Sequence, residues 1–181
     1  FMDDYEATLM TLEEQYKLFR YKNVEADDIA AYLVSKLWNK HTMWLVSSDR
    51  DWDLLIKPTV SRFSYVTRKE VTSSNWSEHY EVDQEDYISF KCLTGDTGDN
   101  VPGIPGVGPK RAAALIQTYG SALDIADAMP LEGKYKYIQS TNDFGAEGIM
   151  RNYELMDLVT YCEDAVGSDN VKDIDKKIRD E

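Results

Sequence analysis

Residues 95–111 read Gly-Asp-Thr-Gly-Asp-Asn-Val-Pro-Gly-Ile-Pro-Gly-Val-Gly-Pro-Lys-Arg, and they decide the architecture around them. The part from Gly95 to Gly108 holds five glycines and two prolines, which predicts a loop. Residues 109–119 then carry apolar side chains on one helical face, so the loop opens onto a helix. Glycines let a backbone approach a phosphate closely, and a helix N-terminus offers that phosphate free N–H groups.

Two basic residues in the first turn of this helix strengthen the prediction of an anionic partner. The helix macrodipole disfavours cations at this end, so helix stability does not account for Lys110 and Arg111. We therefore expect the hairpin to hold a DNA backbone without reading its bases. The alternative is an ordinary Gly-Pro connection between two helices. The predicted DNA-binding residues are Gly106, Val107, Gly108, Pro109, Lys110 and Arg111.

Three acidic clusters lie at residues 25–28, 48–53 and 95–100. Each has an ordinary explanation by itself: acids favour helix N-termini, aspartates form Asx-turns, and polar loops are common. Their combination is more informative, because two like charges ~4 Å apart repel by about 4 kcal/mol at an effective dielectric near 20. Carboxylates that converge would therefore either protonate or hold cations, and oxygen ligands favour Mg²⁺ or Mn²⁺, the ions of phosphoryl transfer. The predicted metal ligands are Glu25, Asp27, Asp28, Asp49, Asp51, Asp96 and Asp99, and of these Glu25, Asp27, Asp49 and Asp51 are the predicted catalytic residues, acting through the metal.

The hydrophobic pattern predicts an α/β first part and a helical second part. Periodic apolar residues indicate helices over residues 3–21 and from 26 onward, and short runs indicate a buried strand at 43–46 and another at 62–67. No strand is predicted after residue 83. We expect helices at 83–93, 109–119, 121–129 and 145–158, followed by a frayed, charged last dozen residues. The expected domains are residues 1–82 and 83–181.

The composition sets limits on function. There are 33 acidic and 20 basic residues, a net charge of −13, so any contact with DNA must be local. No apolar run approaches the ~18 residues of a membrane span. Two distant cysteines argue against a disulfide scaffold and suit a reducing, cytoplasmic location, which is the host cytoplasm if the protein is viral. The start at Phe1 predicts a fragment or a processed piece.

These features, in this order, resemble the 5′-nuclease (flap endonuclease) family, and they are most similar to the 5′→3′ exonucleases of T5-like tailed bacteriophages. The residues that carry the resemblance are 24–28, 48–53, 62–64, 95–100, 103–110 and 134–139. The resemblance implies a partial PIN-like sheet flanked by helices, followed by a helix–three-turn–helix DNA-binding module. It also implies a Mg²⁺-dependent, structure-selective nuclease that hydrolyses DNA phosphodiesters by a two-metal mechanism.

The same resemblance implies the role of each cluster. Glu25, Asp27 and Asp28 would hold the first ion, and Asp49, Asp51, Asp96 and Asp99 the second. In some relatives the hairpin also binds K⁺ through main-chain carbonyls. The matching positions are Leu93, Thr94, Pro102, Ile104 and Val107.

The resemblance also implies an N-terminal segment with further acids and a basic arch, which this sequence does not contain. We therefore expect the chain alone to be a poor nuclease. The implied partners are branched or nicked duplex DNA with a 5′ end or 5′ flap, and that N-terminal segment. Two other functions remain open: a non-catalytic duplex-DNA-binding module or half of a split nuclease, and an acidic adaptor.

Overall fold

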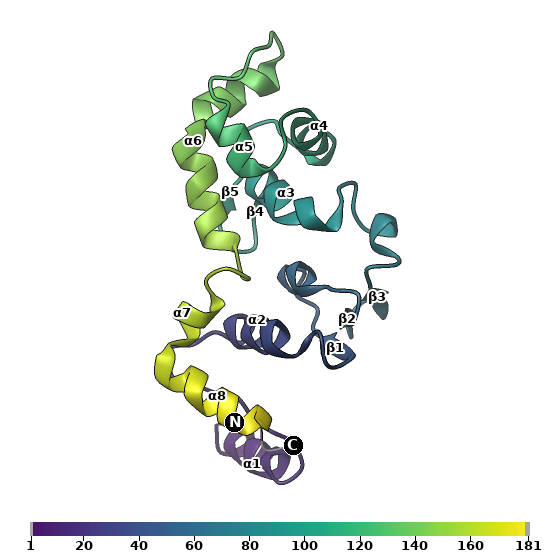
Figure 1. Ribbon diagram of the computed structural model, residues 1–181, viewed down its shortest axis with the longest axis vertical. Helices are drawn as coiled ribbons and strands as arrows, with labels where there is room; N and C mark the ends of the chain where they lie inside the picture. The colour runs from purple at the N-terminus through teal and green to yellow at the C-terminus, as the bar shows by residue number, and fades with distance from the viewer. Residues whose placement is uncertain (1, 180–181) are drawn as a thin grey trace. The chain divides into compact units, whose positions relative to one another are not determined.

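The computed structural model describes residues 2–179 and divides the chain into two compact units (Figure 1). One unit joins the two ends of the chain, up to Leu37 and from Val159 onward, and the other runs from Trp38 to Leu158. Within the described residues, no helix has both the length and the apolar character needed to cross a membrane. This division differs from the expected domains 1–82 and 83–181. Those domain bounds remain a prediction.

The first unit is helical and contains α1 (Met2–Glu13), α2 (Ala26–Leu37), α7 (Cys162–Val166) and α8 (Ser168–Arg179). Helix α7 packs on α2, and the Tyr32 hydroxyl donates to Asp175 of α8 at 2.8 Å. The Tyr21 hydroxyl donates to Asp173 at 2.7 Å. These bonds between distant parts of the sequence tie the last helix to the N-terminal part of the unit.

Two sequence-based predictions about this unit are wrong. The helix expected over residues 3–21 ends at Glu13, and Lys17 beyond it donates to the Lys177 carbonyl at 2.7 Å. The segment expected to fray is helix α8, in which Ile174 is fully buried. Most residues of this segment are charged, so its narrow apolar face is hard to recognise in the sequence. A narrow apolar face is still enough for a helix to pack against a neighbour.

The second unit begins with a three-stranded sheet of β1 (Met43–Val46), β2 (Val60–Ser64) and β3 (Lys69–Val71). Strands β1 and β2 are parallel, with Leu45 opposite Arg62, and β3 is antiparallel to β2. Strand β1 was expected to be buried, yet Trp44 is 53% and Val46 62% exposed. The strand expected at 62–67 ends at Ser64, because the chain turns there into β3.

The short helix η1 (Asp51–Leu55) connects β1 to β2, and two more short helices follow the sheet, η2 (Trp76–Glu78) and η3 (Gln84–Asp86). The larger helices of this unit are α3 (Tyr87–Thr94), α4 (Pro109–Tyr119), α5 (Ala122–Asp127) and α6 (Lys136–Met156). Helix α6 packs along α3 and α5 (Figure 1). Helix α4 matches its prediction. Helix α6 begins nine residues before the predicted 145 and is interrupted at Gly145, whose φ is +75°.

The glycine-rich stretch between α3 and α4 is more ordered than a loop. Strands β4 (Gly95–Asp96) and β5 (Val101–Pro102) pair antiparallel, although no strand was predicted after residue 83. Gly95 has a φ of +73°, and a Cβ on Gly103 would overlap the Thr94 carbonyl. Glycine at both positions therefore lets the two arms of the hairpin cross closely. Asn152 of α6 fastens the arms by donating to the carbonyls of Cys92 at 3.0 Å and Pro102 at 2.8 Å.

The predicted fold class is confirmed: a small α/β part precedes a helical module. One apolar core runs through the second unit, from Ile56 near the sheet through Trp76 and Leu93 to Ile149 of α6. Because this core is continuous, it holds the loop after β1 and the hairpin after α3 in one structural unit.

Candidate functional site

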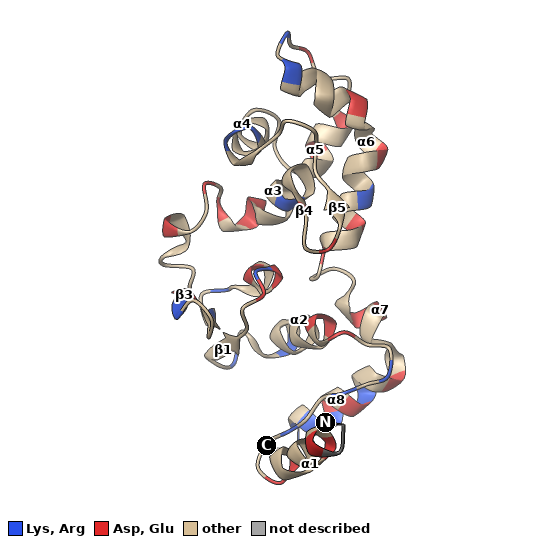
Figure 2. Cartoon of the chain, turned by 180° about the vertical axis from the view of Figure 1, so that it is seen from behind, with Lys and Arg blue, Asp and Glu red and all other residues tan. Residues whose placement is uncertain are grey.

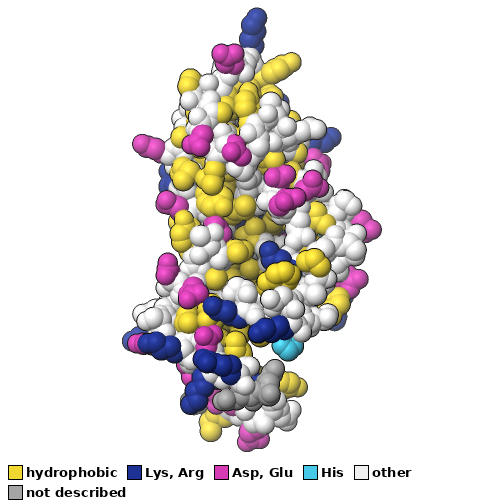
Figure 3. All heavy atoms as spheres, in the orientation of Figure 1, with side chains coloured by type: hydrophobic (Ala, Val, Ile, Leu, Met, Phe, Trp, Pro, Cys, Tyr) yellow, Lys and Arg dark blue, Asp and Glu magenta, His cyan; other side chains and the backbone are white. Residues whose placement is uncertain are grey.

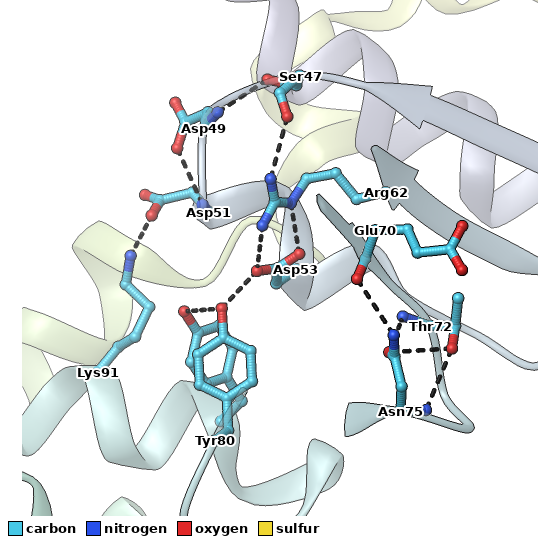
Figure 4. Close-up of polar contacts among 11 residues, drawn as sticks. Ser47, Asp49, Asp51, Asp53, Arg62, Glu70, Thr72, Asn75, Tyr80 and Lys91 are labelled. Atoms are coloured by element: carbon cyan, nitrogen blue, oxygen red, sulfur yellow. Dashed lines mark hydrogen bonds and ion pairs between the residues drawn. The ribbon is translucent and has the colours of Figure 1, made fainter. Parts of the chain in front are cut away.

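The loop after β1 is a tight turn at the carboxyl end of the strand. The Asp49 amide donates to the Ser47 hydroxyl at 3.1 Å, and the Asp51 amide donates to the Asp49 carboxylate at 2.9 Å (Figure 4). The second bond is an Asx-turn, so one function of Asp49 is local. The turn directs Asp51 towards α3, where its carboxylate meets Lys91.

Asp51 lies close to two acids of the hairpin. Asp51, Asp96 and Asp99 each offer a carboxylate oxygen, and these oxygens lie within 4.8 Å of one another. The Asp96 carboxylate also accepts from the Gly98 amide at 2.8 Å, which fixes its orientation. The structure thus brings together three of the four acids predicted for the second ion, and Asp49 is outside this group.

A buried lysine that sequence reasoning missed lies against the acid group. The Lys91 ammonium contacts the carboxylate of Asp51 and lies 3.1 Å from that of Asp96, and its side chain is 7% exposed. Burial by itself would lower the pKa of Lys91, but the hydrogen bond and charge of Asp51 raise it above its usual value. The ammonium therefore stays charged at neutral pH. The available signal was a lysine inside the otherwise mostly apolar run at residues 87–93.

The pKa values of the two carboxylates that contact Lys91 are shifted in opposite directions. Burial raises the pKa of Asp51, and Lys91 offsets this only in part. Burial also acts to raise the pKa of Asp96, but Lys91 and the Gly98 amide outweigh it and lower that pKa. We attribute the difference to the deeper position of Asp51, since desolvation penalises the charged carboxylate.

The acid group suits a divalent cation. Three carboxylates and one ammonium leave two uncompensated negative charges at short range, which is unfavourable without a counterion. The donors are all oxygens, the type that Mg²⁺ and Mn²⁺ prefer. The group therefore fits a hard divalent ion, which would add the charge that Lys91 does not supply.

A buried ion pair between Arg62 and Asp53 stabilises the loop after β1. Arg62 of β2 holds Asp53 through two hydrogen bonds of 2.5 and 2.7 Å, and a third of 3.0 Å reaches the Ser47 carbonyl (Figure 4). Asp53 is fully buried and also accepts from the Tyr80 hydroxyl. The Asp53 carboxylate is thus occupied by contacts with Arg62 and Tyr80. Arg62 links both ends of the Ser47–Asp53 loop.

The first acidic cluster belongs to the other compact unit. Asp27 and Asp28 lie in the first turn of α2, after Glu25, and Figure 2 shows this acidic helix start. Burial, followed by the charges of Glu25 and Asp27, raises the pKa of Asp28. Desolvation makes the carboxylate of Asp28 harder to ionise, and the two neighbouring acids add to this effect.

The hairpin leads into α4 as predicted. Gly108 is the N-cap, Pro109 is the first helical residue, and Gly106 has a φ of +78°. Arg111 folds back to donate to the Gly106 carbonyl at 2.6 Å, and Lys110 is exposed. A Cβ on Gly108 would meet no atom within 4 Å, so packing inside the protein does not require glycine there.

The carbonyls predicted to bind K⁺ lie in and around the crossing arms of the hairpin. Three of them already accept hydrogen bonds: Leu93 from Ile104 at 2.9 Å, Ile104 from Val107 at 2.9 Å, and Pro102 from Asn152. A carbonyl oxygen has a second lone pair, so these bonds leave room for an ion. Binding of K⁺ at Leu93, Thr94, Pro102, Ile104 and Val107 remains a prediction.

A cluster of carboxylates at a strand end, beside a glycine hairpin that opens onto a helix, is an arrangement that suits a divalent cation and a phosphate group. The family model described as "5′-3′ exonuclease, C-terminal SAM fold" matches residues 82–177, more than half of the chain. The chain belongs to this 5′-3′ exonuclease family.

Individual relatives agree with this assignment. The flap endonuclease of Escherichia phage T5 is 44% identical over 167 residues, which are 91% of this chain and 57% of that protein. A T5 5′-exonuclease mutant matches with a TM-score of 0.86 and 43% identity, over 93% of this chain and 70% of that one. T5 flap endonuclease in a pseudo-enzyme–product complex with DNA and metal ions matches with a TM-score of 0.87 and 42% identity, over 95% and 65%. The chain thus spans a little over half the length of the curated T5 relative.

Proposed function

We propose that this chain forms part of a divalent-metal-dependent 5′ nuclease that hydrolyses DNA phosphodiester bonds at 5′ ends and 5′ flaps. The observation that carries the proposal is the convergence of Asp51, Asp96 and Asp99 within 4.8 Å beside Lys91. The relatives, named as flap endonucleases and as a 5′-3′ exonuclease, support the choice of substrate.

The proposed metals are two Mg²⁺ or Mn²⁺ ions. Asp51, Asp96 and Asp99, with Asp49 beside them, would hold the second ion, and Glu25, Asp27 and Asp28 the first. Bound ions of this kind lower the pKa of a water nucleophile and stabilise the leaving oxygen. The side chains would have separate tasks: the carboxylates would hold the ions, and the Lys91 ammonium would favour the ionised forms of Asp51 and Asp96.

The hairpin would bind the DNA backbone. The exposed Lys110, the position at a helix N-terminus and the open space around Gly108 all suit a phosphate. None of these groups distinguishes one base from another, so binding would not depend on sequence. A K⁺ ion on the hairpin carbonyls would add to the positive charge there. If the acids serve no catalysis, the same features support a non-catalytic duplex-binding module as the second candidate.

A cleavage assay separates the two candidates. We expect this chain to cleave a 5′-flap DNA in Mg²⁺ poorly when it is assayed alone, and faster together with an N-terminal nuclease segment of a T5-like relative. The double variant Asp96→Asn/Asp99→Asn should lose that cleavage but still bind duplex DNA, because the proposed DNA-binding residues Gly106–Arg111 are unchanged. Asp127→Asn, at an exposed position on α5, is the matched control. Binding of DNA without cleavage in either format would favour the non-catalytic module.

A further inference from the structure

An exposed tyrosine stands at the start of α6 without a structural reason of its own. Tyr135 is the N-cap of this helix, but its side chain makes no capping hydrogen bond, and its exposed fraction is 71%. Ser, Thr, Asp and Asn are the residues that favour this position. Neither burial nor helix capping therefore accounts for the ring.

The Tyr135 ring is the outer end of a stack that begins at the hairpin. It lies nearly parallel to the Tyr137 ring, with 5.8 Å between centroids and 16° between planes. The Arg111 guanidinium lies 5.6 Å from the centroid of Tyr137 and donates to the Gly106 carbonyl. Tyr137 in turn packs against the apolar core. The stack is thus anchored on the protein and continuous with the proposed DNA-binding hairpin.

The backbone that carries Tyr135 is fixed. The Asn142 side chain both donates to and accepts from the backbone of Leu131, at 2.9 and 2.7 Å. The Tyr135 carbonyl accepts from the Ile138 amide at 3.0 Å. A ring on such a segment is held in place before a partner arrives, which reduces the entropy lost on binding.

The surroundings of the ring favour an anionic, aromatic partner. Lys134 and Lys136 flank Tyr135 and are exposed, with Glu132 as the nearby acid in the sequence. Figure 3 shows basic and hydrophobic side chains, with an acidic one beside them, projecting where the α5–α6 loop lies. Aromatic rings beside basic residues are how proteins bind unpaired nucleotides, because a base stacks on the ring while the cations hold its phosphates.

We propose that Tyr135 is a stacking platform for an unpaired base of the DNA whose backbone is held at Gly106–Arg111. This inference rests on the proposed binding of DNA and adds a contact with single-stranded nucleotides near the hairpin. The ring accepts any base, because every base offers a flat face.

The test compares DNA affinity between variants in EDTA, where cleavage does not occur. Fluorescence anisotropy is measured on a blunt duplex and on the same duplex with a single-stranded extension. We expect Tyr135→Ala to weaken binding of the extended DNA about 5- to 150-fold and to leave the blunt duplex unchanged. Tyr135→Phe should bind like the parent chain. The control is Tyr65→Ala, since Tyr65 is a 55% exposed tyrosine in the same unit.

A second readout reports stacking directly. With 2-aminopurine in the single-stranded extension, the parent chain and Tyr135→Phe should quench its fluorescence, and Tyr135→Ala should not. Equal binding by Tyr135→Ala and Tyr65→Ala would overturn the proposal, as would equal weakening on both DNAs. Failure of the parent chain to bind either DNA would overturn the proposed DNA binding as well.

Discussion

Lys91 places a buried ammonium between two carboxylates of the acid group, and at the scale of single residues this contact has opposing effects. The ammonium reduces repulsion among Asp51, Asp96 and Asp99, and it also competes with any metal ion for the same oxygens. Without a metal, the lysine stabilises the site. With one, part of its attraction is redundant, because a divalent ion neutralises the same charges.

We therefore expect Lys91→Met to lower the melting temperature in EDTA, since a broken buried ion pair costs about 3–5 kcal/mol. Mn²⁺ should raise the melting temperature of Lys91→Met by more than it raises that of the parent chain. Differential scanning fluorimetry with and without Mn²⁺ measures both effects. An equal Mn²⁺-induced shift in the two proteins would mean that Lys91 and the ion do not share ligands.

Asp53 and Arg62 form the second residue-scale contact. Asp53→Asn leaves a buried guanidinium without its carboxylate, so we expect a loss of about 3–5 kcal/mol in the free energy of unfolding. Urea denaturation provides the measurement, and Asp127→Asn is the control. A loss below about 0.5 kcal/mol, typical of surface substitutions, would show that the pair does not support the loop.

At the scale of elements, the sequence patterns predicted those helices and strands whose apolar residues follow a clear local pattern. Helices α2 and α4 match because their apolar residues recur at helical spacing, and β1 matches because a short apolar run ends in turn residues. Strand β3 and the two-residue strands β4 and β5 were missed, because such short elements depend on pairing partners rather than on local pattern. Lys91 and the Asp53–Arg62 pair were missed for a related reason. The roles of these residues depend on contacts with side chains distant in the sequence, and the spacing of apolar residues gives no information about such contacts.

Two glycines of the hairpin provide a matched pair for testing that element. Gly103→Ala should be strongly destabilising and should weaken Mn²⁺ binding, because the added Cβ would push the Thr94 carbonyl and β4 away. Gly108→Ala should change stability by no more than about 1 kcal/mol, the range of N-cap substitutions, yet weaken duplex binding. Urea denaturation and anisotropy measure the two effects. Similar stability losses in both variants would contradict the conclusion that Gly103 is closely packed and Gly108 is not.

At the scale of the whole molecule, charge limits how the chain can meet DNA. The net charge is −13, and Figure 2 shows acidic residues spread over both units, whereas the basic start of α4 is a small area. Long-range attraction to DNA is therefore weak, and binding depends on local contacts at the hairpin. The negative net charge of the chain also makes the binding of cations at the acid group more favourable.

The most direct measurement is thermal unfolding in MnCl₂ against KCl of matched ionic strength. An ion that binds the folded chain raises its melting temperature. We predict a rise for the parent chain and for Asp127→Asn, and no rise for Asp96→Asn/Asp99→Asn. An equal rise in all three proteins, or none in any of them, would contradict a metal site at Asp51, Asp96 and Asp99.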